Sequence, residues 1–225
     1  MTRPLVLDID GTLSGPDRAI EGRVFDRLRS WPEPIVVATG KAFPYPIALC
    51  QFIGLPPRAV AENGGVVFAE DTVVFNGDPE AAARVKDDLE STGYDLGWGA
   101  GDLVNRWRET ELAISREVPR DPIDRSADRH GLEVIDSGFA YHVKPPDVDK
   151  GVGLTTIAEL LDLDPSAFVA VGDSENDVAT FETAGVGFAV ANADDRACQA
   201  ADYITDGAYA DGLFEALDAV ESQSL

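Results

Sequence analysis

The amino-acid sequence predicts an α/β fold: a Rossmann-like, doubly wound parallel sheet core that carries a small inserted α/β cap domain. Three short, valine-rich apolar runs each end at a polar residue, and helix-like stretches lie between them. Unbroken apolar runs of this kind indicate strands that are covered on both faces, as in a parallel sheet packed between helices. A central stretch with a different pattern, bounded on both sides by structure-breaking residues, indicates the insertion.

The elements of the core follow from these patterns. The apolar runs predict strands at 5–7, 35–38 and 168–172, which lead into Asp8, Thr39 and Asp173. A helix is expected over 151–161, where apolar residues recur at helical spacing. A second helix is expected over 175–184, because Ser174 is a good N-cap and Gly185 a good C-cap.

The middle of the chain predicts helices over 81–89 and 119–129 and strands over 111–116, 132–135 and 139–143. Residues 111–116 alternate between apolar and polar, which is typical of a strand with one exposed face. The breaker-rich segments 77–79 and 145–147 mark the boundaries. We therefore expect residues 1–79 and 147–225 to form the core and residues 80–146 to form the cap.

Composition excludes several classes of protein. The 225 residues include 41 acidic and 18 basic ones, for a formal charge of −23, and 44% are apolar, so a folded core is expected. The charge argues against nucleic acid and membrane surfaces as partners, and no apolar run reaches the roughly 18–20 residues of a membrane span. The acidic N-terminal region does not resemble a signal peptide, and Cys50 and Cys198 cannot form a disulfide framework, so a cytoplasmic protein is expected.

The acidic residues are spread along the whole chain, and only four lysines accompany 14 arginines. A dispersed coat of carboxylates with few lysines favours adaptation to concentrated salt, where self-repulsion is screened. An ordinary acidic enzyme is the alternative.

Polar residues at the ends of the core strands indicate a ligand site. In open α/β sheets, ligands bind just outside the carboxyl ends of the strands, so Asp8, Thr39 and Asp173 should meet there. Asp8 and Asp10 are two positions apart, which places both side chains on one side of an extended chain. Gly11 allows a sharp turn and brings backbone N–H groups near a bound anion.

A second acidic group lies in Gly172-Asp173-Ser174-Glu175-Asn176-Asp177. Carboxylates complementing a helix dipole explain part of it, but they do not explain Asp173 beside Asp8 and Asp10. Carboxylates that meet without a counter-charge repel, so a hard cation with oxygen ligands, Mg²⁺, is expected. Lys150 precedes a helix that points at the same edge, where its ammonium could bind phosphate oxygens. The alternative, a surface lysine, is weakened because the chain has only four lysines.

These motifs resemble those of haloacid dehalogenase superfamily phosphatases of the Cof-type subgroup. The resemblance rests on Asp-x-Asp-Gly-Thr at 8–12, on Thr39-Gly40, on Lys150, and on Gly-Asp-x-x-Asn-Asp at 172–177. The stretch 61–65, Ala-Glu-Asn-Gly-Gly, is also typical of that subgroup. The short cap and the Val-Asp-Lys-Gly wording around Lys150 most resemble the archaeal phosphoglycolate phosphatases. Lys41 departs from the usual Thr-Gly-Arg, and its role stays open.

The resemblance implies a Mg²⁺-dependent phosphate monoester hydrolase that works through an aspartyl-phosphate. It makes Asp8 the nucleophile and Asp10 the general acid and base. It assigns phosphate binding to Thr39, Gly40, Lys150 and Asn176, and metal binding to Asp8, Asp10 through its main-chain oxygen, Asp173 and Asp177. The expected partner is a small phosphorylated metabolite, 2-phosphoglycolate above all, and the expected state is a monomer or a homodimer.

Other functions share parts of this pattern. A sugar-phosphate phosphatase or a hexose phosphomutase would use the same fold and first step. A phospho-accepting signalling domain also places an aspartate at a strand end, and a glycosyltransferase could use the Asp-x-Asp pair. In the cap, basic and amide side chains could recognise a substrate carboxylate or could simply lie at an acidic surface: Asn105, Arg106, Arg108 and Arg116.

Overall fold

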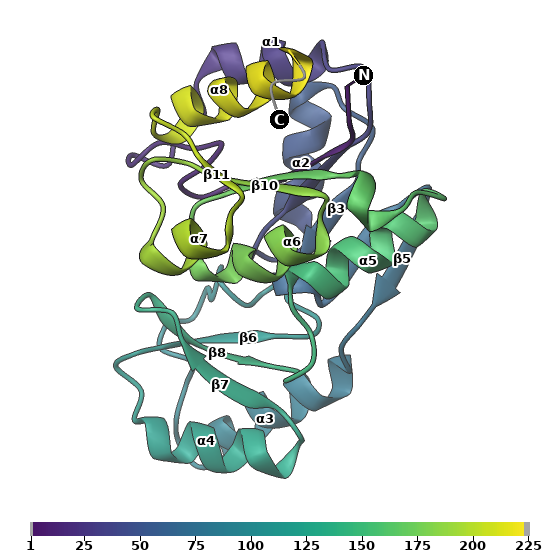
Figure 1. The fold of residues 1–225 in the computed structure, drawn as a ribbon. Coiled ribbons are helices and arrows are strands. Elements are labelled where there is room, and N and C mark those ends of the chain that lie inside the picture. The colour runs from purple at the N-terminus through teal and green to yellow at the C-terminus, as the bar shows by residue number, and fades with distance from the viewer. Residues whose placement is uncertain (1, 223–225) are drawn as a thin grey trace.

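The computed structural model describes residues 2–222 and contains a large α/β part and a smaller part with a second sheet (Figure 1). The eight strands of the large sheet are β1 (Leu5–Asp8), β2 (Ile35–Ala38), β3 (Ala59–Ala61), β4 (Val66–Ala69), β5 (Thr72–Phe75), β9 (Val169–Gly172), β10 (Val186–Ala189) and β11 (Tyr203–Ile204). Their order is β11-β10-β9-β1-β2-β3-β4-β5. All neighbours pair in parallel except β3–β4 and β4–β5, which are antiparallel, so the prediction of a doubly wound parallel sheet is confirmed.

Helices cover both faces of this sheet (Figure 1). One face carries α1 (Gly22–Arg29), α2 (Pro44–Ile53) and α8 (Tyr209–Ser222). The other carries α5 (Lys150–Leu160), α6 (Val178–Thr183) and α7 (Asp195–Ala200). Short 3₁₀ turns complete this part: η1 (Glu62–Gly64), η2 (Pro165–Ala167) and η3 (Glu175–Asp177).

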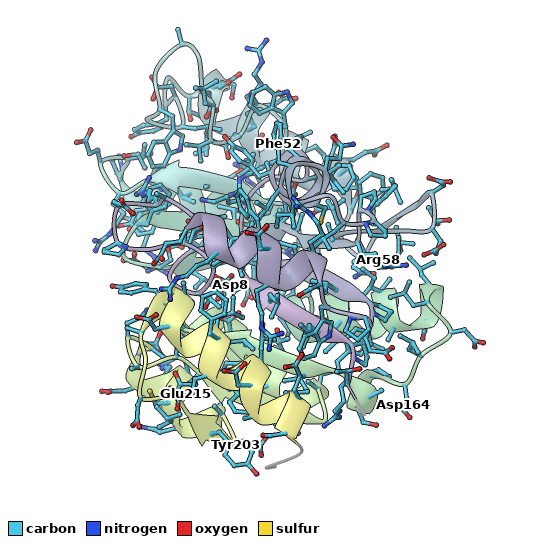
Figure 2. The ribbon with its side chains drawn as sticks, turned by 90° about the horizontal axis from the view of Figure 1, so that it is seen from above. Asp8, Phe52, Arg58, Asp164, Tyr203 and Glu215 are labelled. Carbon is cyan, nitrogen blue, oxygen red and sulfur yellow. The ribbon has the colours of Figure 1, made fainter. Side chains whose placement is uncertain are left out.

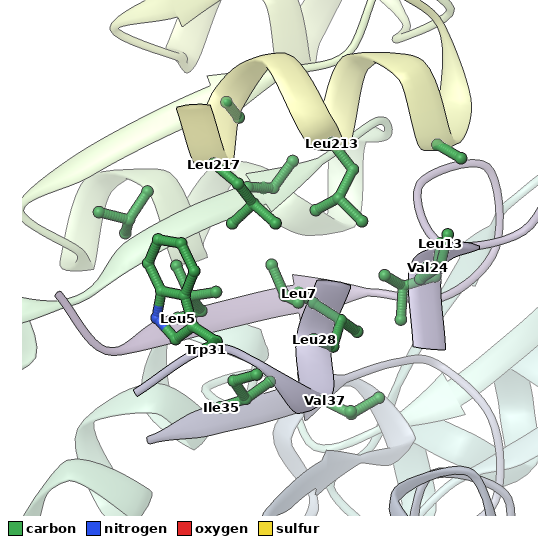
Figure 3. Packing of buried hydrophobic residues seen from close by; sticks show 14 of the residues in the cluster. Leu5, Leu7, Leu13, Val24, Leu28, Trp31, Ile35, Val37, Leu213 and Leu217 are labelled. Carbon is green, nitrogen blue, oxygen red and sulfur yellow. The ribbon is translucent and has the colours of Figure 1, made fainter. Parts of the chain in front are cut away.

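The alternation of side chains along β1 explains why the strand is apolar throughout. Leu5 and Leu7 pack with Leu213 and Leu217 of α8 on one face, as Figure 3 shows. Val6, between them, packs into the cluster on the opposite face. A strand buried on both faces needs an unbroken apolar run, and its first polar residue is the one where the sheet ends.

The second sheet consists of β6 (Leu112–Ser115), β7 (Glu133–Asp136) and β8 (Ala140–Lys144) in the antiparallel order β6-β8-β7. Its helices, α3 (Pro79–Ser91) and α4 (Arg120–Arg129), lie on the side away from the large sheet (Figure 1). The chain enters this part after β5 and leaves it before α5. The boundaries of the cap at 80 and 146 stay a prediction.

The strand predicted within 111–116 is present as β6, but the prediction of an exposed face is wrong, because all four residues of β6 are buried. Leu112 and Ile114 belong to the apolar cluster shared with α3 and α4. The loop before β6 binds its free edge, where the Trp98 indole and the Asn105 amide both donate to the Ala113 carbonyl, at 2.7 and 2.8 Å. The same loop covers the other face, because Gly97 lies directly against the Ser115 side chain. The alternation of apolar and polar residues in the sequence therefore reflects different neighbours on the two faces of β6, and both faces are covered.

No helix within the described range is long and apolar enough to cross a membrane. The acidic residues lie mostly at the surface, since only four of the 41 are buried: Asp8, Glu62, Glu111 and Asp177.

This surface carries a testable consequence for salt dependence. Between about 0.1 and about 2 M KCl we expect the melting temperature to rise by about 5 °C or more, because salt screens the repulsion among the carboxylates. Thermal melts monitored by circular dichroism at several KCl concentrations measure the effect. A melting temperature that stays constant or falls would contradict salt adaptation.

Candidate active site

Three strand ends meet at the carboxyl edge of the large sheet. β1 lies between β2 and β9, and the three parallel strands lead into Asp8, Thr39 and Asp173. Seen from above, the buried Asp8 lies near the centre of the view, whereas Asp164 and Tyr203 lie at the periphery (Figure 2). The topology thus brings together polar residues that are far apart in sequence.

Three aspartate carboxylates gather at this edge. Asp8, Asp173 and Asp177 each offer an oxygen, and these oxygens lie within 4.8 Å of one another. Thr12 Oγ1 donates a hydrogen bond to Asp173 Oδ1 over 3.0 Å. Gly11 has φ +89° and turns the chain close to this carboxylate, where a Cβ would overlap the Asp173 side chain.

The turn η3 positions Asp177. Its Oδ2 accepts hydrogen bonds from the backbone N–H groups of Asp173, at 3.0 Å, and of Ser174, at 3.1 Å. The helix predicted over 175–184 therefore begins as a 3₁₀ turn behind Ser174 and continues as α6. The other oxygen, Oδ1, stays directed at Lys150.

Lys150 is the first residue of α5 and is almost fully buried, so the alternative of a surface lysine is wrong. Its Nζ lies 2.6 Å from Asp8 Oδ1 and 2.7 Å from Asp177 Oδ1. It also donates to Asn176 Oδ1 at 3.0 Å. Burial lowers the pKa of Lys150, but the carboxylates of Asp177 and Asp8 outweigh burial and raise it, so the ammonium is charged.

The charges of this cluster fit a divalent cation. Burial raises the pKa of Asp8 well above its usual range, although Lys150 opposes the effect. Burial and the Asp177 carboxylate raise the pKa of Asp173 to about 7. Three carboxylates and one ammonium leave two negative charges when all are ionised. Oxygen ligands of this kind suit a hard cation such as Mg²⁺, which would relieve the repulsion.

Asp10 lies apart from the three clustered carboxylates. Its side chain is 48% exposed, and its Oδ2 forms an ion pair with Lys41 Nζ at 2.8 Å. This position is compatible with an Asp10 side chain that acts away from the metal and an Asp10 main-chain oxygen that binds the metal. Lys41, whose role the sequence leaves open, is thus the direct partner of Asp10.

Thr39 and Gly40 form a tightly held backbone segment. The buried Thr39 hydroxyl accepts a hydrogen bond from Lys41 N–H over 3.1 Å, which leaves its own proton free to donate. The Gly40 carbonyl accepts from Arg108 Nη2 over 2.8 Å. Arg108 precedes β6, so this bond ties the second sheet to the edge of the first.

Comparison with known proteins now decides the family. Residues 127–217 match the family model of haloacid dehalogenase-like hydrolases. The chain is 58% identical over 220 residues to a phosphoglycolate phosphatase of Natronomonas pharaonis, with 97% of each chain covered. It is 52% identical over 219 residues to a phosphoglycolate phosphatase of Halobacterium salinarum, again with 97% of each chain covered. The chain belongs to the haloacid dehalogenase-like hydrolases.

The fold of this hydrolase agrees with a solved structure. A crystal structure of a Thermoplasma acidophilum protein matches it with a TM-score of 0.82 and 24% sequence identity, covering 98% of this chain and 99% of that chain. The similarity extends over both sheets, because almost the full length of each chain is included.

A polar network centred on the buried Glu111 connects the cap side of the hydrolase to Lys150. Glu111 accepts hydrogen bonds from Arg108, at 3.0 Å, and from Asn63 Nδ2, at 2.8 Å, and it contacts His142 Nδ1 at 2.5 Å. Asn63 Oδ1 in turn accepts from Asn176 Nδ2 over 3.1 Å. The sequence pattern 61–65 indicated a special segment here, but no local signal pairs Asn63 with Glu111.

The network also involves strained backbone. Glu62 and Asn63 have φ values of 52° and 51°, in the left-handed region that costs about 1–3 kcal/mol for a residue with a side chain. The buried Glu62 carboxylate accepts from Glu109 N–H and from the N–H and hydroxyl of Thr110, at 2.8–3.1 Å. Both strained residues therefore hold the segment that enters β6.

The other cap side chains considered for carboxylate recognition have local partners. Asn105 is buried and bonds to Ala113 and Asp102. Arg116 pairs with Asp136, and Arg106 lies over the Trp107 ring at the surface. With Arg108 bound to Glu111 and Gly40, none of the four has a cationic or amide group directed at Asp8 or Asp10 in the described part of the chain.

The raised pKa of Asp173 predicts opposite effects of Asp173→Asn with and without metal. A raised carboxyl pKa means that the folded state holds the proton more tightly, so the contribution of Asp173 to the unfolding free energy decreases as the pH rises from 3.8 to about 7. Without metal at pH 8, Asp173→Asn should therefore be more stable than the native chain by about 1 kcal/mol or more. Added Mg²⁺ should stabilise the native chain and leave the variant almost unchanged.

Urea unfolding at pH 5 and pH 8, with EDTA or with Mg²⁺, measures these effects. The Thr12 hydroxyl can still donate to the Asn Oδ1, so local packing is kept. Equal stabilisation of both proteins by Mg²⁺ would exclude Asp173 as a ligand.

Proposed function

We propose that this hydrolase is a Mg²⁺-dependent phosphoglycolate phosphatase, which converts 2-phosphoglycolate to glycolate and phosphate through an aspartyl-phosphate on Asp8. The supporting observation is the buried Asp8–Lys150 pair within a carboxylate cluster at the carboxyl edge of the sheet. The similarity to proteins named phosphoglycolate phosphatase supports the choice of substrate. The reaction would take place in the cytoplasm, in a monomer or a homodimer.

In the first step an oxygen of the Asp8 carboxylate attacks phosphorus in line with the ester oxygen. A bond forms between Asp8 and phosphorus, and the bond between phosphorus and the glycolate oxygen breaks. Asp10 donates a proton to the departing alkoxide, so glycolate leaves as a neutral alcohol at that oxygen. Lys150 holds Asp8 Oδ1 at 2.6 Å, which fixes the orientation of the attacking carboxylate.

In the second step Asp10, now ionised, takes a proton from the water that attacks phosphorus. The bond between phosphorus and Asp8 breaks, which restores the carboxylate and releases phosphate. The half-exposed position of Asp10 suits a group that exchanges protons with both an alcohol and water.

Other side chains bind the phosphoryl oxygens and stabilise their charge. Lys150 supplies an ammonium, and the Thr39 hydroxyl and the Gly40 backbone lie at the end of β2. Asn176 Oδ1 accepts a hydrogen bond from Lys150 Nζ, and Asn176 Nδ2 donates to Asn63 Oδ1, so the contribution of Asn176 includes orienting Lys150. A Mg²⁺ ion held by Asp8, Asp173, Asp177 and the Asp10 main-chain oxygen would offset the charge of the incoming phosphate.

A panel of phosphate monoesters in Mg²⁺ and high KCl tests the proposal. The panel compares 2-phosphoglycolate with hexose phosphates by kcat/KM, and it follows hexose 1- and 6-phosphate interconversion separately. We expect 2-phosphoglycolate to be the best substrate and EDTA to abolish turnover.

A hexose phosphate that is better by more than about tenfold, or 1.4 kcal/mol, would replace the substrate assignment. Interconversion without phosphate release would indicate a mutase. A stable acyl phosphate without turnover would indicate a phospho-accepting signalling domain.

A further inference from the structure

We propose that Lys41 binds the carboxylate of the substrate and thereby selects monoesters whose leaving group carries a negative charge close to the ester oxygen. This inference rests on the proposed function, because it takes Asp10 as the group that protonates the leaving oxygen. It assigns a role to the residue that departs from the usual family pattern.

Lys41 lies on the leaving-group side of the site. Its Nζ is 2.8 Å from Asp10 Oδ2, whereas Lys150 contacts Asp8 on the nucleophile side. A proton donor must lie about 2.6–3.2 Å from the oxygen that it protonates. The ammonium bound to Asp10 is therefore next to the place where the alcohol departs.

The chemistry of 2-phosphoglycolate places a carboxylate at that point. A single methylene carbon separates the carboxylate from the ester oxygen, so the carboxylate oxygens lie about 3 Å from the ester oxygen, given bonds of about 1.5 Å. A group that contacts Asp10 is then within reach of the carboxylate. An ammonium carries three donors, so Lys41 can keep Asp10 and bind the substrate as well.

The other cationic side chains that contact site residues already have buried partners. Lys150 is buried between Asp8 and Asp177. The Arg108 side chain is only 6% exposed and binds Glu111 and the Gly40 carbonyl. The Lys41 side chain is 35% exposed and, within the described residues, forms one ion pair, with Asp10. It can therefore accept a further anion without breaking a buried contact.

The backbone around Lys41 is held in place, which makes the side chain a defined recognition element. Lys41 N–H donates to Thr39 Oγ1 at 3.1 Å, and the Lys41 carbonyl accepts from Glu62 N–H at 3.0 Å. The preceding Gly40 carbonyl is held by Arg108 at 2.8 Å. Preorganisation of this kind reduces the entropy lost when the substrate binds.

The test compares 2-phosphoglycolate with ethyl phosphate, a monoester of similar size without the carboxylate. Lys41→Met keeps the length of the side chain and removes its charge, and Lys41→Arg keeps the charge. We expect Lys41→Met to lower the preference for 2-phosphoglycolate, as a ratio of kcat/KM values, by about 10- to 100-fold, the effect of losing one charge-assisted hydrogen bond. Lys41→Arg should retain most of the preference.

Further measurements separate this role from others. Lys86→Met, at a half-exposed lysine of α3 that pairs with Glu90, is the matched control and should leave the ratio unchanged. Inhibition by inorganic phosphate should be unaffected by Lys41→Met, because Lys41 faces the alcohol.

Equal losses on both substrates would overturn the inference, since Lys41 would then act only through Asp10. Weaker inhibition by phosphate would also overturn it and would place Lys41 at the phosphoryl group. If the native chain itself has no preference for 2-phosphoglycolate over ethyl phosphate, the proposed substrate fails together with the inference. When the native chain does prefer 2-phosphoglycolate, the results with the variants test the role of Lys41 separately from the proposed function.

Discussion

Asp8→Asn is expected to reduce Mg²⁺-dependent hydrolysis of p-nitrophenyl phosphate by a factor on the order of 10⁴ or more. The amide has no negative charge with which to attack phosphorus, so neither the acyl phosphate nor any later step can form. The fold should survive, because burial already disfavours the charged form of Asp8 and an amide of the same shape can still accept from Lys150. Phosphate release and melting temperature, measured side by side, separate chemistry from stability.

Asp26→Asn is a matched control for this variant. Asp26 lies on α1 with a side chain that is 84% exposed, and its replacement should leave turnover unchanged. Near-normal turnover in Asp8→Asn would remove Asp8 from the role of nucleophile.

Lys150→Met is expected to lower the unfolding free energy of the metal-free protein by about 3–5 kcal/mol, the usual effect of removing one partner of a buried ion pair. The ammonium has two carboxylate partners within 2.7 Å, and without it Asp8, Asp173 and Asp177 would repel one another with no counter-charge. Activity should also fall strongly, because Lys150 both orients Asp8 and binds phosphoryl oxygens in the proposed mechanism. Urea unfolding with and without Mg²⁺ measures the effect on stability.

Lys144→Met provides the control. Lys144 is also buried, but its Nζ pairs with Glu133 and with the carbonyls of Pro145 and Val148, away from the carboxylate cluster. Both variants should lose stability. Mg²⁺ should stabilise Lys144→Met about as much as the native chain, because its carboxylate cluster is intact, and Lys150→Met more, since only there can a cation replace the missing charge. No stabilisation of either variant by Mg²⁺ would contradict a metal site at these carboxylates, and equal stabilisation of both would show that the cation does not replace the charge of Lys150.

The sequence alone was enough to predict the sheet and the residues that gather at its edge. The apolar runs before Asp8, Thr39 and Asp173 predict three strands, and these are adjacent and parallel in the structure. A strand buried on both faces must be apolar throughout, so the polar residue at its end can be recognised from the sequence alone. Apolar spacing likewise predicts the helix over 151–161, which in the structure begins one residue earlier, at Lys150.

Tertiary structure decided the contacts between distant side chains. Lys41 pairs with Asp10 because the neighbouring strands β1 and β2 end at the same edge of the sheet. Asn63 of η1 bonds to Glu111, 48 positions away, because the fold places η1 against the segment that enters β6. It also decided burial: β6 alternates in sequence but is covered on both faces by a loop and two helices. The sequence pattern shows which face of a helix or strand is apolar. The partners of a side chain, and how far it is desolvated, depend on the residues that the fold packs against it. For that reason the ionisation of Asp173 and the recognition role proposed for Lys41 could be inferred only once the three-dimensional arrangement was in hand.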